Sequence, residues 1–406
     1  MPSLGKYELH EELGKGGFAT VYRATHKSLH TEVALKLLSP ALAADESARQ
    51  RFIQEAQTAS SLEHPRIVQV LDLGEAKEQV FLTMEYLPGG DLRSLVQKKG
   101  VLPQPQVLQI LKDIGEALDF AHSRNVLHRD VKTSNILLDG KMRARLSDFG
   151  LVRVKDAPHL TQLGTVVGTA AYTSPEQAES KPLDARSDQY SLGIVAYELL
   201  VGKLPFQGEG STAVALMHIT KPPPQPSLVN PEIPTEVDAV LLKALSKQPG
   251  ERYASCTEFI LAIESALESS QRRRYRELLA QAQTALEKGD YAQVGTLLDE
   301  ARLRIPARAD LRATLAELES ARRAAEDYQQ ITRDWESARQ QAQDVLELFP
   351  QYPDPQGIFA TLGLRKARRS LPPPAELARQ AGLGALLGLP LAALALYLAF
   401  RFITRR

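Results

Sequence analysis

A short polar segment at 128–135 constrains the fold of this 406-residue chain more than any other feature. Its sequence is His-Arg-Asp-Val-Lys-Thr-Ser-Asn, and apolar-rich runs flank it at 118–127 and 136–138. The first run is long enough for a helix, whereas the second has the length of a short strand. A polar loop held between a helix and a strand is a position in which folds place catalytic side chains.

The side chains of this loop suit phosphoryl transfer. Asp130 can accept the proton of an attacking hydroxyl, Lys132 can neutralise charge on the moving phosphoryl group, and Asn135 can bind a metal ion. Thirteen residues after Asn135, the triplet Asp148-Phe149-Gly150 supplies a second acid placed to bind Mg²⁺. One His-Arg-Asp triplet is a weak signal, but the complete loop followed at this interval by Asp-Phe-Gly is specific.

Together, these two motifs resemble those of serine/threonine protein kinases, most closely the eukaryotic-type kinases of bacteria. The resemblance implies an α+β fold of two lobes, with an antiparallel sheet in the smaller lobe and mainly helices in the larger one. It also implies an enzyme that transfers the γ-phosphate of ATP to serine and threonine hydroxyls of protein substrates. The metal would be Mg²⁺, with Mn²⁺ as an alternative ion.

A glycine-rich turn near the start of the chain fits the same family. The sequence after Leu13 is Gly-Lys-Gly-Gly-Phe-Ala-Thr-Val, close to the kinase pattern G-x-G-x-x-G-x-V, with Ala19 where the pattern has its third glycine. Gly14 and Gly16 allow the backbone to approach phosphate groups without a Cβ clash. The residues expected to bind nucleotide here are Leu13, Gly14, Lys15, Gly16, Gly17, Phe18, Ala19, Thr20 and Val21.

A lysine on the next apolar strand is a further expected nucleotide contact. Lys36 ends the run Val-Ala-Leu-Lys, and the resemblance assigns it to the α- and β-phosphates, with Ala34 on the same strand lining the site. Such a lysine needs a carboxylate partner, and Glu55 lies on a segment at 51–62 with helical spacing. The family pattern favours this pair over the alternative that Glu55 is one more exposed helix charge.

Another apolar strand, Val-Phe-Leu-Thr-Met-Glu-Tyr-Leu, leads into Pro-Gly-Gly-Asp and resembles the hinge between kinase lobes. The resemblance places Met84 beside adenine and assigns hydrogen bonds with the base to the backbones of Glu85 and Leu87. Asp91 would face the ribose, and Leu137 would line the site from the strand after the polar loop. Recognition of adenine by backbone leaves little trace in a sequence, so these assignments depend on the family.

The segment after the Asp-Phe-Gly triplet resembles a kinase activation segment, with a peptide-docking loop at 168–176. Thr169 in this loop would contact the catalytic aspartate and lysine, which is the pattern of serine/threonine kinases and not of tyrosine kinases. The resemblance pairs Glu176 with Arg252 in the interior, where loss of one partner costs about 3–5 kcal/mol. Asp188 would brace the backbone of the polar loop.

The same segment carries candidate regulatory sites. Arg129 precedes the catalytic aspartate and can receive a phosphate, because a phosphothreonine adds about −1.5 to −2 charges that pair with arginine. We therefore expect autophosphorylation on Thr161 or Thr165, with Thr169 more structural than regulatory. The alternative is that these threonines are ordinary loop residues.

The kinase resemblance covers residues 7–267, and the composition then changes. Residues 271–369 are rich in Ala, Leu, Gln, Glu and Arg with helical spacing. A weak repeat relates Tyr291 to Trp335, an interval of 44 residues that exceeds the 34 of tetratricopeptide repeats. The sequence predicts an all-α region, either tetratricopeptide-like or a coiled coil, that offers a surface to protein partners.

Residues 381–400 contain no charged side chain and would span about 30 Å as a helix, the thickness of a bilayer core. Apolar residues occupy every face, unlike a helix packed on a protein surface, although a buried core helix is the alternative. Five Lys and Arg residues between 365 and 379 outnumber the three Arg after residue 400. The sequence predicts a single transmembrane helix in contact with lipid, with the kinase domain in the cytoplasm.

Composition excludes several other classes of protein. Lys and Arg number 49, as do Asp and Glu, and this balance argues against a basic surface for nucleic acid. The single cysteine, Cys256, cannot form an intrachain disulfide, so we expect a reducing compartment. The first twelve residues lack the long apolar core of a secretory signal.

Two rival functions share the kinase fold. A pseudokinase would bind nucleotide and partner proteins without phosphotransfer, but such proteins usually lack one of the residues equivalent to Lys36, Asp130 and Asp148, all of which are present. A kinase of small molecules would not need the peptide-docking loop. We therefore expect a protein kinase.

The expected membrane helix can be tested at its centre. We expect Leu391→Arg to move the protein from the membrane fraction to the soluble fraction, because arginine in place of leucine at the bilayer centre costs about 3–4 kcal/mol. Leu391→Ala keeps the segment uncharged and should remain with the membranes. The measurement is ultracentrifugation of cells lysed without detergent, and soluble wild-type protein would contradict the prediction.

Overall fold

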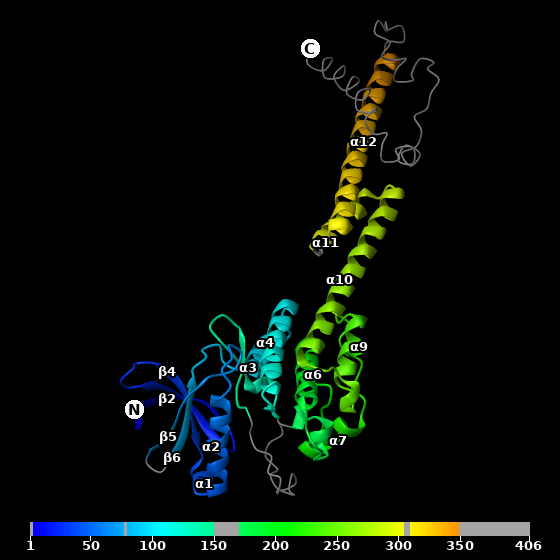
Figure 1. Ribbon diagram of the computed structural model, residues 1–406. Coiled ribbons are helices and arrows are strands. Elements are labelled where there is room, and N and C mark those ends of the chain that lie inside the picture. The colour runs from blue at the N-terminus through cyan, green and yellow to red at the C-terminus, as the bar shows by residue number, and fades with distance from the viewer. Residues whose placement is uncertain (1–2, 77–78, 150–169, 304–308, 349–406) are drawn as a thin grey trace. The chain divides into compact units, whose positions relative to one another are not determined.

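The computed structural model describes residues 3–76, 79–149, 170–303 and 309–348, which Figure 1 shows as coloured ribbon. The chain divides into two compact units, Met1–Ser270 and Gln271–Arg406, and the division falls within α10 (Cys256–Glu287). The expected transmembrane segment, 381–400, lies outside the described residues. So do the three threonines of the expected activation segment, Thr161, Thr165 and Thr169. Within the described ranges, no helix combines the length and the apolar character that a membrane crossing requires.

The N-terminal lobe of the first unit is built on a six-stranded sheet in the order β1-β2-β3-β4-β6-β5. Every neighbouring pair in it is antiparallel. The strands are β1 (Ser3–Leu4), β2 (Tyr7–Lys15), β3 (Ala19–His26), β4 (Glu32–Leu38), β5 (Val70–Ala76) and β6 (Gln79–Glu85). Central strands β4 and β6 carry nearly continuous buried runs, because α2 packs on one face of the sheet there and side chains of β1, β2 and β3 pack on the other.

Helix α2 (Glu46–Ser60) packs on this sheet and turns one glutamate inward. Asp45 caps the helix by accepting hydrogen bonds from two backbone N–H groups of the first turn. The buried positions recur every three or four residues: Ala48, Phe52, Glu55, Ala56 and Ala59. Phe52 and Ala56 pack against β4 and β6, so Glu55 on the same face is directed into the protein interior.

The C-terminal lobe of the first unit is mainly helical. The short helix α1 (Pro40–Ala43) belongs with α2 to the N-terminal lobe. The helices of the C-terminal lobe are α3 (Leu92–Lys99), α4 (Gln104–His122), α5 (Pro175–Ala178), α6 (Ala185–Val201), α7 (Ser211–Thr220), α8 (Pro226–Val229), α9 (Thr235–Ala244) and the start of α10. Short 3₁₀ turns are η1 (Thr133–Asn135), η2 (Ala170–Tyr172) and η3 (Pro249–Glu251), and β7 (Ile136–Leu138) pairs with β8 (Ala144–Leu146). The expected two-lobed α+β architecture is confirmed.

Helix α6 is the centre of this lobe. Residues 187–197 of α6 are all buried, so the helix has no solvent face. A Cβ built at Gly193 would lie 3.0 Å from Leu245 Cδ2 and 3.4 Å from Ala244 Cβ. Glycine at this position therefore allows α6 to lie close against the end of α9.

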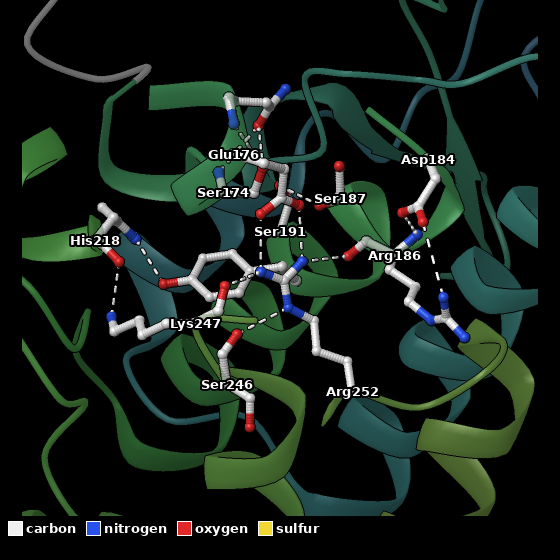
Figure 2. A network of polar contacts seen from close by, with 12 residues as sticks. Ser174, Glu176, Asp184, Arg186, Ser187, Ser191, His218, Ser246, Lys247 and Arg252 are labelled. Atoms are coloured by element: carbon white, nitrogen blue, oxygen red, sulfur yellow. Dashed lines mark hydrogen bonds and ion pairs between the residues drawn. The ribbon is translucent and has the colours of Figure 1, made fainter. Parts of the chain in front are cut away.

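A buried ion pair fixes the chain just before α6 (Figure 2). Arg252 donates to both carboxylate oxygens of Glu176 at 2.7 and 2.8 Å, and neither side chain is more than 5% exposed. The same guanidinium donates to the backbone carbonyls of Arg186, Ser246 and Lys247. The predicted Glu176–Arg252 pair is confirmed. The hydrogen bonds to the three carbonyls give partners to guanidinium N–H groups that burial removes from water.

The second unit contains the end of α10, then α11 (Tyr291–Arg302) and α12 (Ala309–Leu348). Gly289 has φ +75°, and Asp290 caps α11 by accepting from the Gln293 N–H, so the first helix–turn–helix forms as its sequence suggests. The proposed repeat partner, Asp334-Trp335, lies inside α12 without a break, because no glycine precedes it. The choice between a tetratricopeptide-like region and a coiled coil stays a prediction.

The buried ion pair yields a stability prediction. We expect Arg252→Met to lower the free energy of unfolding by about 3–5 kcal/mol, because it leaves the Glu176 carboxylate buried without its partner. Lys181→Met is the matched control, since it breaks the exposed Lys181–Glu179 pair, and such pairs contribute at most about 1 kcal/mol. Thermal melting of the two variants should separate them clearly, and equal melting temperatures would refute the assignment.

Candidate active site

The polar loop is held in place by one buried carboxylate on α6. Asp188 accepts hydrogen bonds from the backbone N–H groups of His128 at 2.8 Å and Arg129 at 2.7 Å, and its Oδ2 lies 2.8 Å from His122 Nε2. Burial opposes ionisation of Asp188, but these hydrogen bonds and the neighbouring imidazoles hold its pKa below the usual value. The predicted bracing contact is confirmed.

Two residues of the site have left-handed backbone conformations. Arg129 has φ +68° and Asp148 has φ +62°, and such conformations cost a non-glycine residue roughly 1–3 kcal/mol. At Arg129 the strain is offset by contacts on both sides of the residue, because Asp188 accepts from its N–H and Gln177 Nε2 donates to its carbonyl at 2.7 Å. The loop is therefore fixed before any substrate binds.

The expected catalytic residues lie together. Lys132 Nζ is 2.7 Å from Asp130 Oδ2, and Asn135 Nδ2 donates to the same oxygen at 3.0 Å and to the Asp130 carbonyl at 2.9 Å. Two donors thus hold one carboxylate oxygen of Asp130, and the described residues place no hydrogen bond on the other. Because the amide nitrogen of Asn135 is used here, its amide oxygen is the atom left for a metal ion.

Lys36 is shared between two acids. Its Nζ lies 2.7 Å from Asp148 Oδ1 and 3.6 Å from Glu55 Oε1, with only 7% of the residue exposed. The Lys36–Glu55 pair is therefore present, but the shorter contact joins the lysine to Asp148, which the sequence did not indicate. Burial opposes the charge on Asp148, and the adjacent ammonium nevertheless holds the Asp148 pKa below its usual value.

Glu55 is the less compensated of the two acids. Its Oε2 is buried, and no described residue forms a hydrogen bond with it. Burial raises the pKa of Glu55 to about 7, and the lysine at 3.6 Å offsets this only in part. Glu55 lines a cavity of about 20 Å³ together with Met84, Asp148 and Phe149.

The expected adenine-contacting residues form one apolar cluster. It contains the buried side chains of Ala34, Val68, Met84 and Leu87, against which Val21 and Leu137 pack. Val68 was not predicted as a site residue, although its place directly after His-Pro-Arg-Ile was the available signal. The Glu85 N–H donates to the Gln69 carbonyl at 3.0 Å, and the contact of the Glu85 backbone with a base stays a prediction.

The glycine-rich turn joins β2 to β3, as expected. Gly14 and Lys15 lie opposite Val21 and Thr20 across the hairpin, Leu13 is half exposed on β2, and Phe18 is 61% exposed at the tip. A Cβ built at Gly14 or Gly17 would meet no atom within 4 Å, and at Gly16 only the Ala19 carbonyl at 3.6 Å. Packing among the described residues does not require glycine here, whereas close approach of phosphate groups does.

Asp91, expected to face a ribose, has a clear local role. Its carboxylate caps α3 by accepting from the Ser94 N–H at 2.8 Å and from the Ser94 hydroxyl at 2.7 Å. The ribose contact stays a prediction. Thr169, expected to contact Asp130 and Lys132, lies outside the described residues.

The residues present fit a nucleotide with a divalent metal. A carboxylate from Asp148 and an amide oxygen from Asn135 are hard oxygen ligands of the kind that Mg²⁺ prefers. Lys36 supplies a cation beside Asp148, and the open glycines supply room for phosphates. The arrangement can therefore hold a polyphosphate next to a carboxylate base, Asp130.

Comparison with known proteins agrees with this geometry. The sequence profile of the protein kinase domain matches residues 7–266. Serine/threonine-protein kinase PknB of Mycobacterium leprae is 43% identical over 258 residues, which cover 62% of this chain and 42% of that protein. PknB of Mycolicibacterium smegmatis is 42% identical over 259 residues, covering 62% of this chain and 41% of that protein.

A solved structure is also similar to this chain. The crystal structure of the Mycobacterium tuberculosis PknI kinase domain has 33% sequence identity and a TM-score of 0.53, covering 65% of this chain and 98% of that chain. The similarity to the curated PknB proteins is confined to a part of them, because this chain spans about four tenths of their length.

The raised pKa of Glu55 makes stability depend on pH. Because its pKa of about 7 in the folded chain exceeds the ordinary value of 4.5, folding strengthens proton binding. The stability that Glu55 contributes is fully present below the unfolded pKa and is lost as the pH rises through the folded pKa. Glu55→Gln stays neutral, so its melting temperature relative to wild type should rise between about pH 5 and pH 8.

The measurement is thermal melting of both proteins without nucleotide across this pH range. Glu63→Gln, which changes an exposed glutamate just after α2, is the control and should keep a constant offset from wild type. A constant offset for Glu55→Gln as well would show that the carboxyl titrates alike in the folded and unfolded chains.

Proposed function

This chain belongs to the protein kinase family, and from that premise we propose that it is a bacterial, eukaryotic-like serine/threonine protein kinase that phosphorylates proteins with ATP. The observation that carries the proposal is the grouping around Asp130, whose carboxylate lies against both Lys132 and Asn135. The pairing of Lys36 with Asp148 supports it, because the cation and the second acid required for phosphoryl transfer meet in one place.

In this proposal, catalysis depends on positioning and on neutralisation of charge. The free oxygen of Asp130 orients the serine or threonine hydroxyl and accepts its proton as the oxygen attacks phosphorus. Lys132 lies beside that carboxylate and stabilises negative charge on the transferred group, while Lys36 orients the phosphates that stay with ADP. Asp148 and Asn135 would hold Mg²⁺, or Mn²⁺ with similar ligand preferences, and the bound ion would supply further neutralisation of phosphate charge.

A pseudokinase scaffold is the less favoured reading. Lys36, Asp130 and Asp148 are all retained, and Lys132 lies against Asp130 as the proposed mechanism requires. A pseudokinase with this constellation would keep the residues of catalysis without using them.

We propose that activity is raised by autophosphorylation on Thr161 or Thr165. Arg129 supports this, because its backbone is fixed while its side chain is exposed and forms no ion pair with any described residue. An exposed guanidinium beside the catalytic aspartate can pair with a phosphothreonine and order the segment that carries it.

We also propose that residues 381–400 anchor the protein in a membrane with the kinase domain in the cytoplasm. The support is the uncharged run with eight Leu and one Phe, together with the excess of Lys and Arg before it. In this arrangement the helical region at 271–369 is available to protein partners, and the anchor itself contacts lipid.

Replacement of the base tests the proposed function. We expect Asp130→Asn to bind nucleotide as wild type does but to lose phosphotransfer by a factor of about 10²–10⁴, because the amide cannot accept the proton. Asp45→Asn is the control, since asparagine also caps α2, and should remain active. Lys36→Met should lose activity together with nucleotide affinity.

The assay uses labelled ATP and Mg²⁺ with the purified chain, alone and with a generic basic protein. Phosphopeptide mapping of the active sample should find phosphate on Thr161 or Thr165 and none in the Asp130→Asn sample. Wild-type rates in Asp130→Asn would exclude the role given to that aspartate, and an unmodified activation segment in active enzyme would exclude the regulatory proposal.

A further inference from the structure

A buried histidine outside the catalytic loop contacts the segment that resembles a peptide-docking loop. His218 lies on α7 and is 0% exposed. Its Nδ1 is 2.9 Å from the hydroxyl of Tyr190 on α6, and its Nε2 is 3.1 Å from the carbonyl oxygen of Ala171 in η2. Both ring nitrogens are therefore used, and one of them reaches across to η2.

The partners of His218 fix its tautomer. A backbone carbonyl only accepts, so Nε2 carries the hydrogen and donates to Ala171. Burial, with a contribution from the charge of Lys247, lowers the pKa of His218 to about 4, so the ring is neutral and Nδ1 accepts from the Tyr190 hydroxyl. The hydrogen bonds run in one direction, from Tyr190 through His218 to Ala171.

The imidazole is also held mechanically. The ring of Phe206 packs edge-on at 4.8 Å and that of Tyr190 at 5.7 Å. Lys247 Nζ donates to the His218 carbonyl at 2.7 Å, which fixes the backbone of α7 at the same residue. The donor that reaches Ala171 thus has a defined position and direction.

The turn that receives this hydrogen bond touches the catalytic loop on its other side. The Tyr172 hydroxyl in η2 lies 2.9 Å from the Thr133 hydroxyl in η1 and donates to Glu198 at 2.5 Å. The Tyr172 carbonyl accepts from Ser191 on α6 at 2.8 Å. A shift of η2 would therefore disturb a contact with the loop that carries Asp130.

Tyr190 joins this contact to the buried ion pair. Its ring lies under the guanidinium of Arg252, 4.7 Å from the ring centroid, and Arg252 holds Glu176. The segment from Ala171 to Glu176 is thus fixed at its start through His218 and at its end through Arg252, with Tyr190 in contact with both. Figure 2 shows His218, Glu176 and Arg252 in one region of the C-terminal lobe.

We propose that His218 is a positioning residue for the protein substrate: by holding the Ala171 carbonyl, it sets the orientation of the turn on which the acceptor peptide docks. The inference depends on the proposed kinase function. It extends that function by giving a residue of α7, His218, a role in binding the protein substrate. A histidine that served only to fill the core would affect stability alone. A positioning histidine affects the protein substrate in particular and leaves ATP binding unchanged.

The test compares three variants with one matched control in steady-state kinetics of the full chain. His218→Phe keeps the aromatic packing and removes both hydrogen bonds, His218→Gln can restore an N–H donor toward Ala171, and Tyr190→Phe removes only the donor to Nδ1. Tyr197→Phe is the control, because its hydroxyl, also on α6, donates to the Pro224 carbonyl and not to the docking segment.

We expect His218→Phe to raise KM for a generic basic protein about tenfold, with KM for ATP and intrinsic ATP hydrolysis within about twofold of wild type. His218→Gln should recover part of the loss, and Tyr190→Phe should show the same pattern with smaller size. Tyr197→Phe should leave both KM values unchanged.

Hydrogen exchange followed by mass spectrometry supplies a readout that does not need phosphotransfer. The amides of 170–176 should exchange faster in His218→Phe and Tyr190→Phe than in wild type or Tyr197→Phe. If wild type transfers no phosphate to protein, the proposed function fails, while this exchange difference still tests the positioning contact.

Two results would overturn the inference. One is an equal effect of His218→Phe and Tyr197→Phe on the KM for protein substrate, and the other is unchanged exchange at 170–176 in both His218→Phe and Tyr190→Phe. If His218→Phe does not fold, Tyr190→Phe decides, because it retains the ring and every packing contact.

Discussion

The site depends on a carboxylate that never meets substrate. Asp188 lies on a helix that is buried all round, and it takes the two consecutive backbone N–H groups at the start of the catalytic loop. The His128 N–H would otherwise be a buried donor with nothing to accept it, a cost of about 1–3 kcal/mol. Because Arg129 is held in a left-handed conformation by the same carboxylate, the direction of the chain at Asp130 follows from this contact.

The surroundings of three carboxylic acids, Asp148, Asp188 and Glu55, shift their pKa values in different directions. Asp188 is buried and Asp148 is partly buried, with 28% of its side chain exposed, yet several N–H donors at Asp188 and a lysine at Asp148 hold both pKa values below the usual value. Glu55, with a more distant lysine and one unpaired oxygen, has its pKa raised to about 7. Lys36 therefore lies closer to Asp148 than to Glu55, and its contact uses only Oδ1 of Asp148.

Sequence reasoning identified the parts of the site that lie in continuous motifs. The catalytic loop was predicted from the chemistry of its own residues, whereas the buried Glu176–Arg252 pair and the bracing Asp188 were predicted from the resemblance to protein kinases, because their partners are distant in the sequence. The nearer partner of Lys36 was missed, since a choice between two acids is made by distances in the folded chain. His218 gave no signal at all, because a histidine in an apolar helix shows its role only when Tyr190 and Ala171 are brought to it from other elements.

Helix α12 has a geometric consequence for whatever follows it. Leu318 is the last buried side chain among those described on this helix, which continues to Leu348. Thirty residues of α-helix measure about 45 Å, so the packed core of the second unit and the end of α12 are separated by a rod of defined length. The helix would hold a ligand bound at its far end at a fixed distance from that core. Insertion or deletion of whole helical turns would change this distance in steps of about 5.4 Å.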